Sequence, residues 1–143
     1  MLVKAILSAK GGDVVTIDPT AKVAAAAKIL AERRIGALVV TGPQRRVIGI
    51  VSERDVVQVI AHRGAAALDL PLTEIMTRKV ATCPSTDTIV SIMEQMTAGK
   101  FRHVPVVEQG RLAGIISIGD VVKHRLEEME REQEALRDYI QTA

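Results

Sequence analysis

Two short segments of the chain place a Ser and an Asp at a spacing that could bind a small polar ligand. Residues 49–55 read GIVSERD and residues 114–120 read GIISIGD, so an Asp follows each Ser by three positions. At the start of a helix this pattern is typical of a capping box, in which the Ser oxygen accepts a backbone N–H and the acid bonds back to the Ser N–H. Asp is one methylene shorter than the usual Glu, and it recurs in both segments. Capping alone is therefore an incomplete explanation.

The same arrangement also suits the phosphate and ribose of a nucleotide. A helix N-terminus has unpaired N–H groups and partial positive charge, so the backbone from Ser117 to Gly119 can hold a phosphate. The hydroxyls of Ser52 and Ser117 add donors. An ionised Asp can accept hydrogen bonds from both ribose hydroxyls. These residues by themselves leave both interpretations open, capping and ligand binding.

The elements that must position these residues occur twice. Residues 15–40 align with residues 81–107 at an offset of 66, and the offset is 65 between Asp55 and Asp120. Each copy predicts a short strand, a helix, two strands joined by a Gly-containing turn, and a helix that starts at the Ser-x-x-Asp. Neither copy alone can bury both faces of its sheet, so the two should pack against each other.

The predicted fold class is therefore α/β, with two β-α-β-β-α repeats packed about a pseudo-twofold axis and a C-terminal helical tail. The predicted boundaries are residues 3–63 for the first repeat, 64–75 for a linker, 76–125 for the second repeat and 126–143 for the tail.

The motifs together resemble a known family. The duplicated Gly-aliphatic-aliphatic-Ser-x-x-Asp, the MTRKVATCP segment and the FRHVPVV segment are similar to those of a tandem pair of cystathionine-β-synthase (CBS) domains, a Bateman module. The resemblance covers roughly residues 3–125. It implies a cleft between the repeats that binds adenosine-containing ligands such as AMP, ATP or NAD(H), and it implies a ribose-binding role for Asp55 and Asp120.

Phosphate would need positive charge from elsewhere in the cleft. Arg102 and His103 stand at the start of a predicted strand beside it, where Arg offers a planar fork for phosphate oxygens and His a titratable donor. The first repeat has Gly36 and Ala37 at that position, and it has Arg54 inside its SERD instead. The alternative for Arg102 is a solvent-facing residue without a role in binding.

The two sites should be unequal. Gly119 allows close approach beside Asp120, whereas the segment before Asp55 carries Glu53, whose charge disfavours phosphate. We therefore expect the Asp120 site to be the stronger one.

Adenine needs a flat apolar slot, and the near absence of aromatic residues predicts an aliphatic one. The candidates are Ile17, Cys83, Val51 and Ile116, for which simple core packing is the alternative. Cys83 has no base arranged beside it, so we expect an inert buried thiol and not a nucleophile. The complete predicted nucleotide-binding set is Thr16, Ile17, Gly36, Ala37, Val51, Ser52, Arg54, Asp55, Thr82, Cys83, Arg102, His103, Ile116, Ser117, Gly119 and Asp120.

Composition excludes several other classes. One Cys rules out an internal disulfide, and with three scattered His it gives no zinc spacing, so no metal is expected. No stretch is long enough for a membrane span, and Lys4 and Lys10 come too early for a signal peptide, which predicts a cytoplasmic protein without membrane contact. A net charge of +2 with one Phe and one Tyr argues against nucleic acid.

The tail predicts an interaction surface. Apolar residues from Val122 to Ile140 recur at alternating spacings of four and three, as in a coiled-coil seam, with a polar break at Gln133. This stripe either pairs with a second copy, giving a homodimer, or folds back on its own module.

The function that follows is a regulatory or sensing module without catalysis, which binds an adenine nucleotide and acts on a regulated partner protein. No catalytic constellation and no catalytic cofactor are indicated. The alternatives are a dimerising interaction adaptor with degenerate nucleotide clefts and, less favoured, a small nucleotide-processing enzyme.

Overall fold

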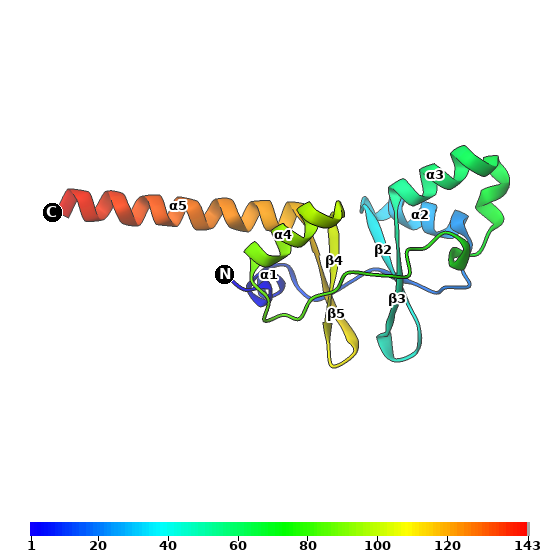
Figure 1. Ribbon diagram of the computed structural model, residues 1–143, viewed down its shortest axis with the longest axis horizontal. Helices are drawn as coiled ribbons and strands as arrows, with labels where there is room; N and C mark the ends of the chain where they lie inside the picture. Colours follow the sequence, from blue (N-terminus) through cyan, green and yellow to red (C-terminus); the bar gives the residue numbers. More distant parts are fainter. Residues whose placement is uncertain (143) are drawn as a thin grey trace.

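The computed structural model describes residues 1–142. It is a mixed α/β chain in which each repeat contributes a small sheet with helices around it, as the sequence predicts (Figure 1). The elements in chain order are α1 (Val3–Lys10), β1 (Thr16–Ile17), α2 (Val23–Arg33), β2 (Ala37–Thr41), β3 (Val47–Ser52), α3 (Glu53–Arg63), α4 (Ile89–Gly99), β4 (His103–Glu108), β5 (Arg111–Ser117) and α5 (Ile118–Thr142).

The two sheets have the same topology. In the first repeat β1 runs parallel to β2, which pairs antiparallel with β3. In the second repeat β4 pairs antiparallel with β5, and Cys83 forms a parallel bridge with Val106 in the place that β1 takes in the first repeat. The two antiparallel hairpins lie side by side at the centre of the molecule (Figure 1). The predicted β-α-β-β-α repeats are confirmed.

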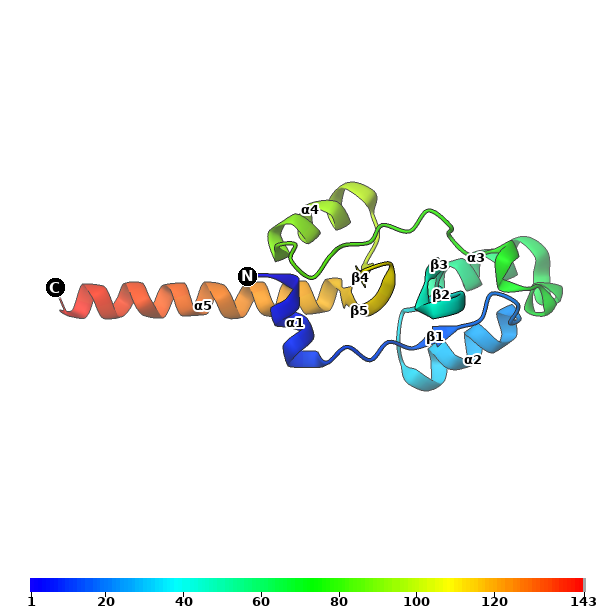
Figure 2. The ribbon, with the colours of Figure 1, turned by 90° about the horizontal axis from the view of Figure 1, so that it is seen from below.

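Each repeat has its own hydrophobic core, and each core borrows a segment from outside the repeat. Val3 and Ile6 of α1 are fully buried in the core of the second repeat, although the sequence boundaries place them with the first. Leu72 of the linker and Met76, directly after it, are buried in the core of the first repeat. Figure 2 shows the N-terminal segment and the linker running between the repeats along opposite edges.

Two equivalent glycines make room for these borrowed segments. A Cβ at Gly49 would lie 2.6 Å from the Met76 sulfur, and a Cβ at Gly114 would lie 2.5 Å from a Leu7 methyl carbon. Both distances are shorter than real Cβ contacts, so a larger residue at either position would force the Met76 or Leu7 side chain to move. In both repeats, the segment borrowed from outside the repeat therefore packs on the equivalent Gly of the sheet. We call it the crossing segment.

The last helix leaves the module. Val121 packs into the second core, but every residue of α5 from Met129 to Thr142 is exposed. Figure 1 shows this part of α5 projecting alone from the rest of the molecule. The stripe of apolar residues in the tail therefore does not fold back on its own module. Within residues 1–142, no helix combines the length and the apolar character that crossing a membrane requires.

Candidate functional site

A cavity of about 670 Å³ opens where the two repeats meet. Its walls come from the ends of β2 and β3, the start of α3, the segment after the linker and the segment before β4. The lining residues are Gly36, Ala37, Ile50, Ser52, Glu53, Arg54, Asp55, Val57, Thr77, Lys79, Val80, Ala81, Lys100, Phe101, Arg102 and His103. Both repeats thus contribute to one site.

Asp55 reaches this cavity from the first turn of α3, where it also closes a capping box. The Ser52 N–H donates to Asp55 Oδ2 at 2.8 Å, and the Asp55 N–H donates to Ser52 Oγ at 3.2 Å. The Ser52 hydroxyl donates to the same Oδ2 at 3.1 Å. Within residues 1–142 no hydrogen bond to Asp55 Oδ1 is formed, so that oxygen is free to accept one from a ligand. Capping and ligand binding are therefore compatible at Asp55.

Asp120 makes the same capping box at the start of α5 but has an additional partner. The Ser117 N–H donates to Asp120 Oδ2 at 2.9 Å, and the Asp120 N–H donates to Ser117 Oγ at 3.1 Å. Lys10, at the end of α1, forms an ion pair with the same Oδ2 at 2.7 Å. Burial would raise the pKa of Asp120, but the bonds from Lys10 and Ser117 outweigh it and hold the pKa below the usual value. The chain's own ammonium thus neutralises this carboxylate through Oδ2, while within residues 1–142 Asp120 Oδ1, like Asp55 Oδ1, accepts no hydrogen bond.

The Asp55 and Asp120 regions differ in the donor that bonds one strand carbonyl in each repeat. In the first repeat the Ile50 carbonyl accepts the backbone N–H of Thr77, which continues the sheet hydrogen bonding at 3.0 Å. In the second repeat the equivalent Ile115 carbonyl accepts the Lys10 ammonium, also at 3.0 Å. A side chain therefore replaces a backbone donor, and its charge reaches Asp120.

His103 lies between the Asp55 region and the Asp120 region. Its ring packs on Gly36 so closely that a Cβ there would lie 3.1 Å from His103 Cε1 and 3.9 Å from a Glu53 carboxylate oxygen. Burial lowers the pKa of His103, Lys10 and Arg102 lower it further, and the charges of Asp120 and Glu53 act in the opposite direction. At neutral pH the ring is therefore mainly uncharged, and a phosphate beside it would favour its protonation.

Four cationic side chains line the cavity: Arg54, Lys79, Lys100 and Arg102. Within the part of the chain that the structure describes, none of the four forms an ion pair. Glu53 and Asp55 are the acidic residues of the lining, so positive charge is in excess. An anionic ligand would relieve this imbalance.

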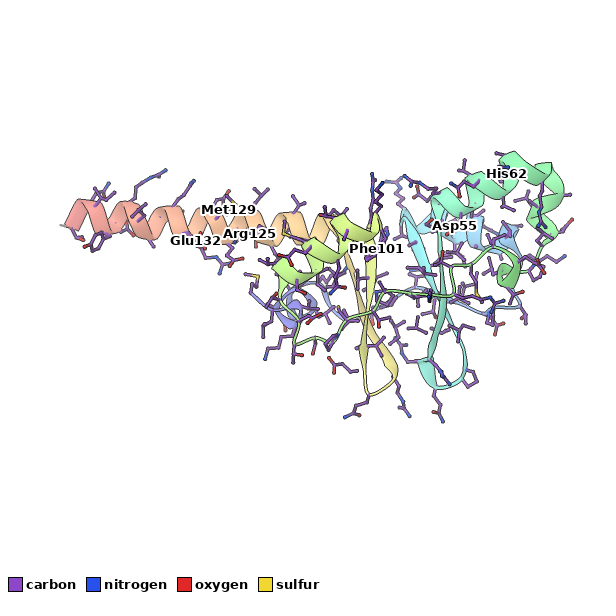
Figure 3. All side chains as sticks on the ribbon, in the orientation of Figure 1. Asp55, His62, Phe101, Arg125, Met129 and Glu132 are labelled. Atoms are coloured by element: carbon purple, nitrogen blue, oxygen red, sulfur yellow. The ribbon has the colours of Figure 1, made fainter. Side chains whose placement is uncertain are left out.

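Sequence reasoning missed part of this lining. Phe101, the single Phe of the chain, lies on the cavity wall across from the α3 end that carries Asp55 (Figure 3). The expectation of a purely aliphatic slot is therefore incomplete, because this ring offers a face for stacking. Phe101 also packs against the core of the second repeat and lies close to Gly99. Lys79 and Lys100 were also missed.

Of the predicted residues, seven line the cavity: Gly36, Ala37, Ser52, Arg54, Asp55, Arg102 and His103. The four proposed for an adenine slot lie in the two cores instead, Ile17 and Val51 in the first, Cys83 and Ile116 in the second. Burial and the charges of Asp87 and Glu108 raise the pKa of Cys83 to about 11, which makes the thiol unreactive.

The other five predicted residues lie outside the lining of this cavity. Ser117, Gly119 and Asp120 are at the start of α5, Thr16 pairs with Val39 in the first sheet, and Thr82 precedes the Cys83 bridge. Among the described residues, no group of three His, Cys, Asp or Glu side chains is arranged to hold a metal ion.

Comparison with known proteins fits this geometry. The CBS domain model matches residues 3–62 and again residues 72–127. The chain belongs to the CBS-domain family and is a tandem CBS pair. It is 35% identical over 120 residues to the mitochondrial CBS domain-containing protein CBSX3 of Arabidopsis thaliana, a match that covers 81% of this chain and 58% of that protein.

Solved structures of CBS proteins share the fold. The CBS-domain protein ATU1752 of Agrobacterium tumefaciens is 51% identical, with a TM-score of 0.83 over 87% of this chain and 92% of that one. The CBS-domain protein PAE2072 of Pyrobaculum aerophilum, whose structure contains AMP, is 32% identical, with a TM-score of 0.75 over 84% of this chain and 89% of that one.

Proposed function

We propose that this CBS pair is a regulatory module that binds an adenine nucleotide, AMP, ATP or NAD(H), in the cavity beside Asp55. The observation that carries the proposal is the cavity of about 670 Å³ between the repeats, into which a ribose acceptor and four cations converge. Ligand sites are typically clefts of roughly 300–1,000 Å³ with a few polar groups on apolar walls.

Each part of a nucleotide finds a matching group. Asp55 has a free carboxylate oxygen for the ribose hydroxyls, and the start of α3 supplies N–H groups and partial positive charge. Arg102 and Lys79 supply charge for phosphate, while Phe101 and Val80 supply apolar surface for the base. The AMP in the structure of the PAE2072 relative supports this ligand class.

The module acts by binding and not by catalysis. The acidic residues of the cavity are Glu53 and Asp55, and Asp55 is held in its capping box by Ser52. His103 has a lowered pKa and is packed on Gly36. We therefore propose that nucleotide occupancy is communicated to a regulated protein, and that the chain forms a homodimer through the exposed apolar stripe of α5.

Calorimetric titration with AMP, ADP, ATP and NADH tests the proposal. We expect saturable binding of at least one of them, at one equivalent per chain, because Asp120 is occupied by Lys10. Binding of none of the four by the folded protein would refute the nucleotide function and favour an interaction adaptor, for which the exposed α5 alone would suffice.

A further inference from the structure

The α5 helix carries an apolar seam that the rest of the chain leaves uncovered. Its apolar members are between 43% and 66% exposed: Val122, Leu126, Met129, Leu136 and Ile140. Gln133 completes the seam, and we use the name α5 seam for these six residues. The neighbouring Val121, on another face of the helix, holds α5 to the module. The exposed part of α5, from Met129 to Thr142, is short enough that an isolated helix would be only marginally stable, so packing of the seam would stabilise it.

We infer that the occupant is α5 of a second copy, aligned in parallel and in register. The inference rests on the homodimer proposed above and adds its geometry. The spacing gives the heptad positions at once: Leu126, Gln133 and Ile140 take a positions, and Val122, Met129 and Leu136 take d positions.

The charges beside the seam favour this alignment. In a parallel pair, the g residue just before an a position faces the e residue just after the next d position of the second copy, five residues further along. Arg125 would then face Glu130 of the second copy, and Glu132 would face Arg137 of the second copy. Both pairs are opposite in charge, and symmetry doubles them. Arg125 also bonds Glu128 of its own helix at 3.4 Å, whereas Glu132 and Arg137 are exposed and form no ion pair within residues 1–142.

An antiparallel alignment that covers the same seam is opposed by charge. It would cross near Arg131 and bring Glu130 opposite Glu130 on one side of the seam and Glu132 opposite Glu132 on the other, which makes two pairs of like charge. It would also set each Gln133 amide against an apolar Met129. In the parallel alignment the two Gln133 amides face each other and can form hydrogen bonds, as buried polar a positions do when they fix a register. Figure 3 shows Arg125, Met129 and Glu132 on the part of α5 that leaves the module.

Disulfide trapping in the full chain tests the alignment. In the parallel pair Leu136 faces its own copy, so Leu136→Cys should oxidise rapidly to a covalent dimer. In the antiparallel pair the two copies of position 136 would be about 15 Å apart and could not be bridged. The wild-type chain is the matched control, because its Cys83 is buried.

A sample that mixes two Cys variants distinguishes the alignments, because each alignment gives its own disulfide product. When Leu126→Cys and mass-tagged Leu136→Cys chains are exchanged and oxidised, the parallel pair gives only like-with-like disulfides, and the antiparallel pair gives only mixed ones. Mixed disulfides, or a dimer without any, would overturn the alignment but leave the homodimer. A monomer by sedimentation at tens of micromolar would overturn both, without bearing on nucleotide binding.

Charge exchange provides a second measurement. Arg137→Glu should weaken the dimer by about tenfold because it faces Glu132 of the second copy, and the double change Glu132→Arg with Arg137→Glu should restore it. No weakening in the single variant, or no recovery in the double, would contradict the parallel alignment.

Discussion

The starts of α3 and α5 have the same capping geometry and different availability. Ser52 with Asp55 and Ser117 with Asp120 make the same pair of short bonds, yet Asp55 lines an open cavity while Asp120 is paired with Lys10 at 2.7 Å. The residue that causes this difference is Lys10. It lies outside both motifs, at the end of the α1 segment that packs on the second repeat. A duplicated motif therefore preserves backbone geometry, while the crossing segment determines whether a cation of the chain neutralises its carboxylate.

The comparison bears on the order of strength expected from sequence. Gly119 and Glu53 suggested that the Asp120 site would be stronger, a prediction that stays untested. We propose the opposite order, because Lys10 already neutralises the Asp120 carboxylate and Asp120 lies outside the lining of the cavity. Four unpaired cations beside Asp55 also outweigh the single Glu53.

The largest effect is expected from Asp55. Asp55→Asn keeps a capping side chain but removes the charged acceptor, so nucleotide affinity should fall by about ten- to a hundredfold with little change in melting temperature. Titration calorimetry measures it. The matched control is Asp120→Asn, which should leave affinity within about twofold. Equal losses in the two variants would break the comparison.

The next effect concerns the phosphate end of the ligand. Arg102→Gln removes a charged fork from the cavity, so ATP should bind about tenfold more weakly while adenosine is unaffected. Arg111→Gln, on an exposed residue at the start of β5, is the control. If adenosine and ATP lost equal affinity, Arg102 would be supporting the fold of the cavity and not binding phosphate.

A smaller effect is expected from releasing Asp120. Lys10→Met places at position 10 the residue found 66 positions later, at Met76, and leaves the Asp120 carboxylate without its cation. A second, weaker equivalent of nucleotide should then bind, and the free energy of unfolding should fall by no more than about 1 kcal/mol. Lys4→Met on the same helix is the control. Weaker binding of the first equivalent would mean that Lys10 contacts the ligand.

The smallest effect is a pH dependence through His103. Because burial lowers its pKa in the folded protein, the unfolded chain binds more protons below the ordinary value of 6.5, and stability without ligand should fall as pH falls through about 6.5. A bound phosphate favours the charged ring, so nucleotide affinity should rise over the same interval. Thermal melts with and without nucleotide measure both trends. Both pH trends should become weaker in His103→Gln but not in His62→Gln. His62 is the control because it lies along α3 away from the cavity (Figure 3).

Much of the fold was predictable because it depends on local signals that the chain repeats. The sequence offset located both sheets, and Ser52 and Ser117 marked the helix starts at Glu53 and Ile118. Seven cavity residues were found because they cluster at the ends of predicted strands and at one helix start. Core and cleft residues share the same apolar character, so Ile17 could not be distinguished from Phe101 by type alone.

The remaining features depend on contacts between distant segments. Lys10 and Asp120 are 110 residues apart, and nothing in the pattern of α1 shows that it packs on the second repeat and not on the first. Lys79 and Lys100 line the cavity for the same reason, since the segment after the linker and the end of α4 are brought together only by the packing of the repeats.

The most direct test follows the backbone amides of the two equivalent motifs during a nucleotide titration by NMR. At one equivalent of ATP, the amide signals of Ser52 and Asp55 should shift in proportion to occupancy, while those of Ser117 and Asp120 stay in place. Movement of the Ser117 and Asp120 signals first, or of both pairs together at the same concentrations, would contradict the account that Lys10 closes one site and leaves the other open.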